Sequence, residues 1–166
     1  MYMSTTSGQF AEELADLHDG SVSLFVTLPI FRELMSSPHI ASALARIEGV
    51  IGEHLAHLDC LRDETAIRRE RRDSDLTRSL FRALSIVRSR PASRERDAQI
   101  LEIVEQAQLF LMGSCGFALR FARQAGVDRS VHVLERSLEQ IRSLAGDFPA
   151  VGPDGAFVPL AANAVA

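Results

Sequence analysis

The chain has 166 residues, which is enough for one domain with a buried core. Hydrophobic residues make up 46% and charged residues 24% of the sequence, a composition that excludes a wholly disordered chain. The net charge is −4, and arginines alternate with acids between 62 and 97, so nucleic-acid binding is disfavoured. The longest uncharged run, 106–119, is shorter than the about 20 residues of a membrane span.

The N-terminal stretch MYMSTTSGQF has no basic start followed by an apolar run. We therefore expect no secretory signal and a cytoplasmic protein. Cys60 and Cys115 lie far apart and belong to no CxxC or zinc-binding spacing. Both are expected to be reduced thiols that pack against other side chains.

Apolar residues recur in steps of three and four from Phe10 to Met35, which predicts a long amphipathic helix. Only position 21, a serine, interrupts this stripe. Pro29 should bend the helix without ending it, because the apolar spacing continues beyond it. In the next segment, SSPHI, Ser37 is a candidate N-cap and Pro38 suits the first position of a new helix.

The second helix is predicted over 38–61. Its inward-facing residues are Ile40, Leu44, Ile47, Ile51, Leu55, Leu58 and Leu61. Within it, the stretch IEGVIGEH places Gly49 and Gly52 three residues apart. Each glycine costs a helix interior about 1 kcal/mol relative to alanine, so these positions call for an explanation.

A shorter amphipathic helix is predicted over 76–87, with Asp73 and Ser74 as candidate N-caps. The RPAS segment then interrupts the chain. A third main helix should run from about Arg94 to Gln124 and end at Gly126, because glycine adopts the left-handed conformation that closes many helices.

The fourth main helix is predicted from Asp128, as its N-cap, to Ala145. No strand pattern competes with these helices. The sequence therefore predicts an all-α fold, with four main helices packed as an antiparallel bundle and one additional short helix between the second and third. We expect the bundle to cover 8–146 and an irregular C-terminal tail to cover 147–166, whose apolar residues are candidates to dock on the bundle or on a second chain. They are Phe148, Phe157 and Leu160.

Three stretches together resemble the YciE/YciF-type branch of the ferritin-like superfamily: FAEELADLHDGSVSLFVTLP, ARIEGVIGEHLAHLDCL and RDAQILEIVEQAQLFLMGSCGFALRFARQAGVDRSVHVLERSLEQ. The matching positions are Leu14, Asp16, Leu17, Leu24, the pair Leu28–Pro29, the run from Gly116 to Gln124, Gly126 and Leu134. The resemblance covers about residues 10–146. It implies a ferritin-like four-helix bundle, which in such proteins often holds two metal ions, and a stress-associated bacterial setting.

The resemblance also assigns the positions where the metal ligands of the family should lie. In this chain they are Ser21, Gly49, Gly52, Gln108, Leu111 and Ile141. A hard dimetal centre is built from carboxylates, and a serine, two glycines, a glutamine, a leucine and an isoleucine cannot assemble such a site. We interpret the six positions as a vacated metal layer or possible pocket, expect no metal and no cofactor, and expect the helices to approach one another closely at the glycines.

Two alternatives remain open. A metal-dependent oxidase or iron-handling protein would need displaced ligands, for which the candidates are His54, His57, Glu53, Glu48, Asp19 and Glu105. A small-molecule sensor would use a cavity at the vacated layer. Nucleophilic catalysis is disfavoured, because the sequence shows no positioned base for Cys60 or Cys115, although His57 precedes Cys60 by three residues.

The sequence thus favours a non-catalytic binding or structural protein over an enzyme. A homodimer is expected, because the LFRALSIV segment and the phenylalanines of the tail are more apolar than solvent-exposed segments need to be. A second pair of glycines, Gly113 and Gly116, indicates close helix contact. No membrane partner is expected, and the ligand is unknown.

Overall fold

The computed structural model describes residues 6–65, 74–144, 150–151 and 157–158. Helices make up almost all of this part of the chain. They are α1 (Thr6–Leu34), α2 (Pro38–Thr65), α3 (Asp75–Arg88), α4 (Arg94–Ala125) and α5 (Asp128–Ser143). The all-α prediction is therefore confirmed, and among the described residues no helix has both the length and the apolar character needed to cross a membrane.

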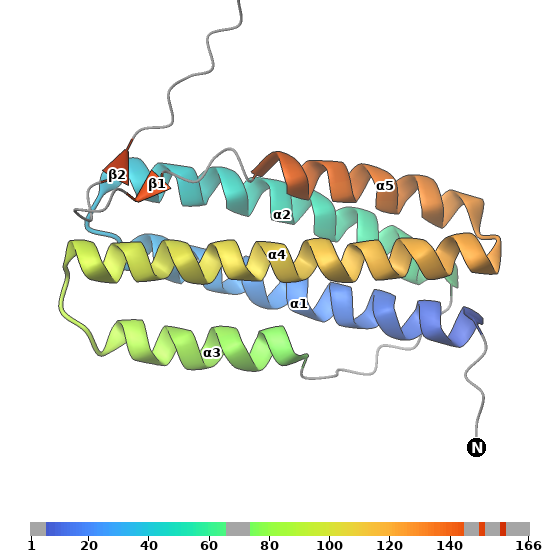
Figure 1. Ribbon diagram of the computed structural model, residues 1–166, viewed down its shortest axis with the longest axis horizontal. Coiled ribbons are helices and arrows are strands. Elements are labelled where there is room, and N and C mark those ends of the chain that lie inside the picture. The colour runs from blue at the N-terminus through green and yellow to red at the C-terminus, as the bar shows by residue number, and fades with distance from the viewer. Residues whose placement is uncertain (1–5, 66–73, 145–149, 152–156, 159–166) are drawn as a thin grey trace, which may run out of the picture.

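The four long helices form a ring in the order α1, α2, α5, α4, and each runs antiparallel to both of its neighbours (Figure 1). α2 and α4 therefore point the same way on opposite corners of the ring, so the chain must return along the bundle between them. α3 makes part of this return and packs in the groove between α1 and α4. This is the bundle with an additional short helix that the apolar spacing predicts.

Local sequence signals set most of the helix ends. The side chain of Ser74 accepts a hydrogen bond from the backbone N–H of Thr77, and Ser93 accepts one from that of Arg96. Gly126 closes α4 with a φ of 70°, where a side chain would be strained. Pro29 lies inside α1 without ending it, as the continuous apolar stripe predicts.

Two expectations about the C-terminal part need correction. Asp128 is the first residue of α5 and not its cap: Val127 occupies the cap position and makes no side-chain capping bond. The tail is not wholly irregular, because Ala150–Val151 (β1) pairs antiparallel with Phe157–Val158 (β2). Asp73, the candidate cap of α3, and the tail residues Phe148 and Leu160 lie outside the described residues.

A glycine in α1 allows the close approach of α3. A Cβ atom at Gly20 would lie 3.2 Å from Cδ2 of Leu76 and 3.4 Å from Cδ2 of Leu111. One turn along, the hydroxyls of Ser23 and Thr77 are 2.7 Å apart and join α1 to α3. The apolar side of α3 is thus buried against the bundle through Leu76, Leu80, Leu84 and Val87.

One buried carboxylate joins the turn between α1 and α2 to the start of α4. Asp97 is 1% exposed, and its oxygens accept hydrogen bonds from the backbone N–H groups of Ser36, at 3.0 and 3.1 Å, and Ser37, at 3.1 Å. Its neighbour Arg96 donates to the carbonyl oxygens of Leu34 and Arg90. These bonds fix how far along its axis α4 lies relative to α1 and α2.

We predict that Asp97→Asn lowers the free energy of unfolding by about 2 kcal/mol, because its amide NH₂ cannot accept the backbone N–H bonds that both carboxylate oxygens accept. Urea denaturation measures this change. Glu102→Gln is the matched control, since it makes the same chemical change on the exposed side of α4. Equal midpoints for the two variants would contradict the role given to Asp97.

Candidate functional site

The six positions of the expected metal layer do not all lie in the core. Ser21, Leu111 and Ile141 are fully buried, and Gln108 is 3% exposed. Gly52 is half-buried, whereas Gly49 is exposed on the outer side of α2. The buried position of α2 at this level belongs to His54, which is 0% exposed and continues the inward stripe of Ile47, Ile51 and Leu58.

On the side of α1 and α2, the layer holds a serine–histidine pair. The Ser21 hydroxyl donates to the carbonyl oxygen of Leu17, 2.7 Å away, and lies 3.1 Å from Nε2 of His54. Because the serine proton is already engaged, His54 donates through Nε2–H to the Ser21 oxygen. Nδ1 of His54 is then an unprotonated acceptor, buried and without a hydrogen-bond partner among the described residues.

On the side of α4 and α5, a glutamine takes the corresponding place. Nε2 of Gln108 donates to the carbonyl oxygen of Ile141 at 2.6 Å. Ser137 lies one turn earlier on α5 and is also fully buried. Within the described part of the chain, Oε1 of Gln108 and the hydroxyl of Ser137 lack hydrogen-bond partners, as Nδ1 of His54 does.

Contacts between the helices place these polar side chains at a common depth. The amide of Gln140 donates to Glu53 across α5 and α2 at 3.1 Å, which brings the residues beside them, His54 and Ile141, to the same height. The Ser21–His54 bond relates α1 to α2, and the Gln108–Ile141 bond relates α4 to α5. Each of the four main helices therefore contributes one polar residue to a layer at mid-depth, which we call the neutral layer: Ser21, His54, Gln108 and Ser137.

The neutral layer disfavours charge. Burial lowers the pKa of His54 to about 4, and the nearby His57 and His18 add a smaller effect in the same direction. Deeper along α4, Cys115 is buried with its Sγ 3.5 Å from the carbonyl oxygen of Leu134, and burial raises the pKa of its thiol to about 12. His54 and Cys115 are thus uncharged near pH 7, and Cys115 is not a thiolate nucleophile.

A charged cluster that the sequence did not suggest lies toward the end of the bundle where α2 ends. Nε2 of His18 is 2.9 Å from Oδ1 of Asp59, and its Nδ1 is 2.8 Å from the guanidinium of Arg62. The compatible assignment has Nε2–H donating to Asp59 while Nδ1 accepts from Arg62. His18 follows Leu17 and Leu14 on the inner side of α1, which is the signal that could have identified it.

The candidate ligands of a displaced metal site are engaged elsewhere or spread apart. Glu48 forms an ion pair with Arg32 at 2.9 Å, Glu53 accepts from Gln140, and His54 binds Ser21. Glu105 is exposed on α4. In the ranges described, no three His, Cys, Asp or Glu side chains gather in a way that could hold a metal ion.

The two glycines of α2 have different surroundings. A Cβ atom at Gly52 would lie 3.2 Å from the ring of Phe25 on α1, so the two helices are close at this point. A Cβ atom at Gly49 would have nothing within 4 Å. The closure expected at the glycines therefore applies to Gly52 and not to Gly49.

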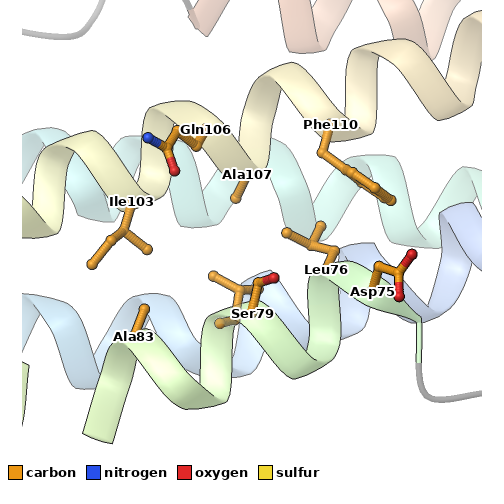
Figure 2. A pocket seen from close by; sticks show the side chains of 9 residues that line it. Asp75, Leu76, Ser79, Ala83, Ile103, Gln106, Ala107 and Phe110 are labelled. Carbon is orange, nitrogen blue, oxygen red and sulfur yellow. The ribbon is translucent and has the colours of Figure 1, made fainter. Parts of the chain in front are cut away.

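An open cleft of about 210 Å³ lies between α3 and α4, away from the neutral layer. Figure 2 shows Ile103, Ala107 and Phe110 on α4 across from Leu76, Ser79 and Ala83 on α3. Its lining is mostly apolar, and its polar side chains are Asp75, Ser79 and Gln106. The cleft is a surface feature of the place where α3 docks.

The sequence and the fold were compared with those of known proteins. No protein-family model matches the sequence, and no curated protein matches it either. Solved structures do match. YcfI from Rhodopseudomonas palustris, described as a candidate structural protein, has a TM-score of 0.76 at 14% identity over 84% of this chain and 90% of its own. The E. coli stress protein YciF has a TM-score of 0.74 at 15% identity over 88% of this chain and 93% of its own.

The chain has the YciF-type fold. The resemblance in the sequence is thereby confirmed for the fold, and a ferritin-like bundle is consistent with it. In this chain, the neutral layer occupies the mid-depth of that fold.

We predict that acid destabilises the protein through His54. Between pH 6.5 and 4 the His54 side chain binds a proton in the unfolded chain but stays neutral in the folded chain. Protonation of His54 therefore leaves the free energy of unfolding unchanged above pH 6.5 and lowers it as the pH falls toward 4. The loss should reach about 3 kcal/mol at pH 4. Urea denaturation at pH 7 and pH 4 measures how far the free energy of unfolding falls between the two pH values. This fall should be smaller for His54→Gln than for the wild type, whereas His39→Gln, at an exposed histidine, should keep the wild-type value. An unchanged drop in His54→Gln would contradict this.

We also predict opposite effects at the two glycines of α2. Gly52→Leu should destabilise the protein by about 1–3 kcal/mol and more than Gly52→Ala, because a longer side chain must displace Phe25. Gly49→Leu should stabilise it by up to about 1 kcal/mol through helix propensity. Melting temperatures decide the question, and a stabilised Gly52→Leu variant would show that the helices are not closed there.

Proposed function

We propose that the chain is a non-catalytic protein of the YciF-type fold that has lost the dimetal centre of ferritin-like proteins and works by binding a partner or by a structural role. YciF is described as a stress protein and YcfI as a candidate structural protein, which supports a stress-associated setting for this chain as well. We place it in the cytoplasm as part of the same proposal.

The observation that carries this proposal is that uncharged side chains fill the interior of the bundle at mid-depth. Ser21 and His54 bind each other, and Gln108 binds the backbone of α5. Leu111 and Ile141, at two further expected ligand positions, are fully buried apolar side chains, and Gly49 and Gly52 offer no side chain at all. A pair of hard cations needs several carboxylates, and bringing one into this layer would require charge where burial already opposes it.

Large apolar side chains on the surface support the proposal that this protein binds a partner. Phe81 on α3 and Phe117 on α4 are 54% and 51% exposed, and Leu109 on α4 is 60% exposed. Scattered apolar residues are ordinary on a surface, but large aromatic ones on neighbouring elements are typical of interfaces. We propose that the partner is a second copy of this chain and that the protein is a homodimer.

Metal analysis tests the loss of the dimetal centre. Protein purified from cultures supplemented with iron, manganese and zinc should contain well under one metal ion per chain by mass spectrometry of the elements, and adding these ions should leave its melting temperature unchanged. About two ions per chain, bound with a rise in melting temperature, would overturn the proposal and favour a displaced site.

A further inference from the structure

The outward side of α4 carries an apolar face centred on a glycine. Its side chains are those most distant from the buried stripe of the helix, and we call it the Gly113 face. It consists of Gln106, Leu109, Phe110, Gly113, Gly116, Phe117 and Arg120. Leu109 is 60% exposed and Phe117 51%, and a Cβ atom at Gly113 or Gly116 would have nothing within 4 Å.

The rest of the bundle leaves much of this face open. α3 lies alongside the N-terminal half of α4 and begins with Asp75 and Leu76 beside Phe110 (Figure 1). The C-terminal half of α4, which carries Gly116 and Phe117, extends beyond α3 in that view. The face is therefore available to another molecule over most of its length.

The residues of the Gly113 face are arranged symmetrically about its centre. Leu109 and Phe117 lie four residues before and after Gly113, and Phe110 and Gly116 lie three residues before and after it. Residues three or four positions apart share one side of a helix. A twofold axis through Gly113 would therefore place each residue of one copy at the same height as the residue at the equal and opposite offset in the other copy.

We infer that the Gly113 face is the dimer interface, in which α4 packs antiparallel against α4 of a second copy about a twofold axis at Gly113. This inference rests on the proposal that the chain is a homodimer. It names the surface through which the two copies bind each other.

The facing residues are complementary in size. Gly116, which has no side chain, leaves room for Leu109 of the second copy on the same edge of the face. Leu109 would lie against Phe117 of the second copy, so that two exposed apolar side chains cover each other. At the centre, Gly113 meets Gly113, which lets the helix backbones approach closely.

A polar residue lies at each end of the face. Gln106 and Arg120 lie seven residues before and after Gly113, so they would face each other. Gln106 already binds the carboxylate of Glu102 at 3.3 Å, and Arg120 would therefore meet an acidic end of the other helix. The guanidinium of Arg120 lies 5.1 Å from the ring centroid of Phe117 and 5.0 Å from that of Phe121, which holds it beside the apolar centre.

Sedimentation at micromolar concentration tests the surface with two matched variants. Phe117→Glu and Phe81→Glu introduce the same charge at equally exposed phenylalanines, one on the Gly113 face and one on α3. We expect the wild type and Phe81→Glu to have the mass of two chains and Phe117→Glu that of one chain. All three should keep the same helical circular dichroism.

Cross-linking provides a second, independent measurement. In a Cys60→Ser background, which removes the exposed native thiol, Gly113→Cys should form an interchain disulfide with oxidised glutathione, because the axis brings the two positions together. Gly49→Cys is the control, since its Cβ is equally open but lies on α2.

The outcomes separate the two proposals. A wild-type mass of one chain overturns the homodimer and this interface together. A two-chain mass that survives Phe117→Glu, with no disulfide at Gly113→Cys, keeps the homodimer and overturns the Gly113 face. If Phe81→Glu alone dissociates the dimer, the interface lies on α3.

Discussion

The bonds from Asp97 to the turn between α1 and α2 are the constraint on which the interior of this bundle depends. Helices that pack side by side can slide along one another at little cost in apolar contact, so packing alone sets their relative height weakly. A buried carboxylate that accepts three backbone bonds sets it firmly. Because α4 is held at this height, Gln108 comes level with Ser21 and His54, and α5 follows α4 through a short turn.

Polar side chains then meet at mid-depth without charge. The layer is uncharged because serine and glutamine carry no charge and because burial keeps the imidazole of His54 neutral. Such a layer is costly to ionise, so it resists the carboxylates that a dimetal centre would require. Its hydrogen bonds also give the pairs α1–α2 and α4–α5 a specific contact, which apolar side chains alone would not provide.

The sequence predicts the helices well, because apolar spacing and capping residues act over a few positions. Ser74 and Gly126 are capping residues predicted from the sequence, and the structure has helix ends at both. Rotation of a helix about its axis is harder to predict: the sequence suggests Gly49 and Gly52 as inner positions, yet Gly49 faces outward and Gly52 is half-buried. The contact of Asp97 with Ser36 and Ser37 joins residues about 60 positions apart, and no local pattern reports it.

The short turns of the bundle have a consequence for how the chain folds. α4 and α5 are joined through Gly126 and Val127 alone, and three residues join α1 to α2, so each pair can form a hairpin from contacts that are close in sequence. The contacts between α1 and α4 instead close a long loop, which slows their formation. We therefore expect two hairpins to form early and independently, and the docking of one on the other to limit the folding rate. During synthesis, the first hairpin would wait for α4 with the inner sides of α1 and α2 still open to solvent.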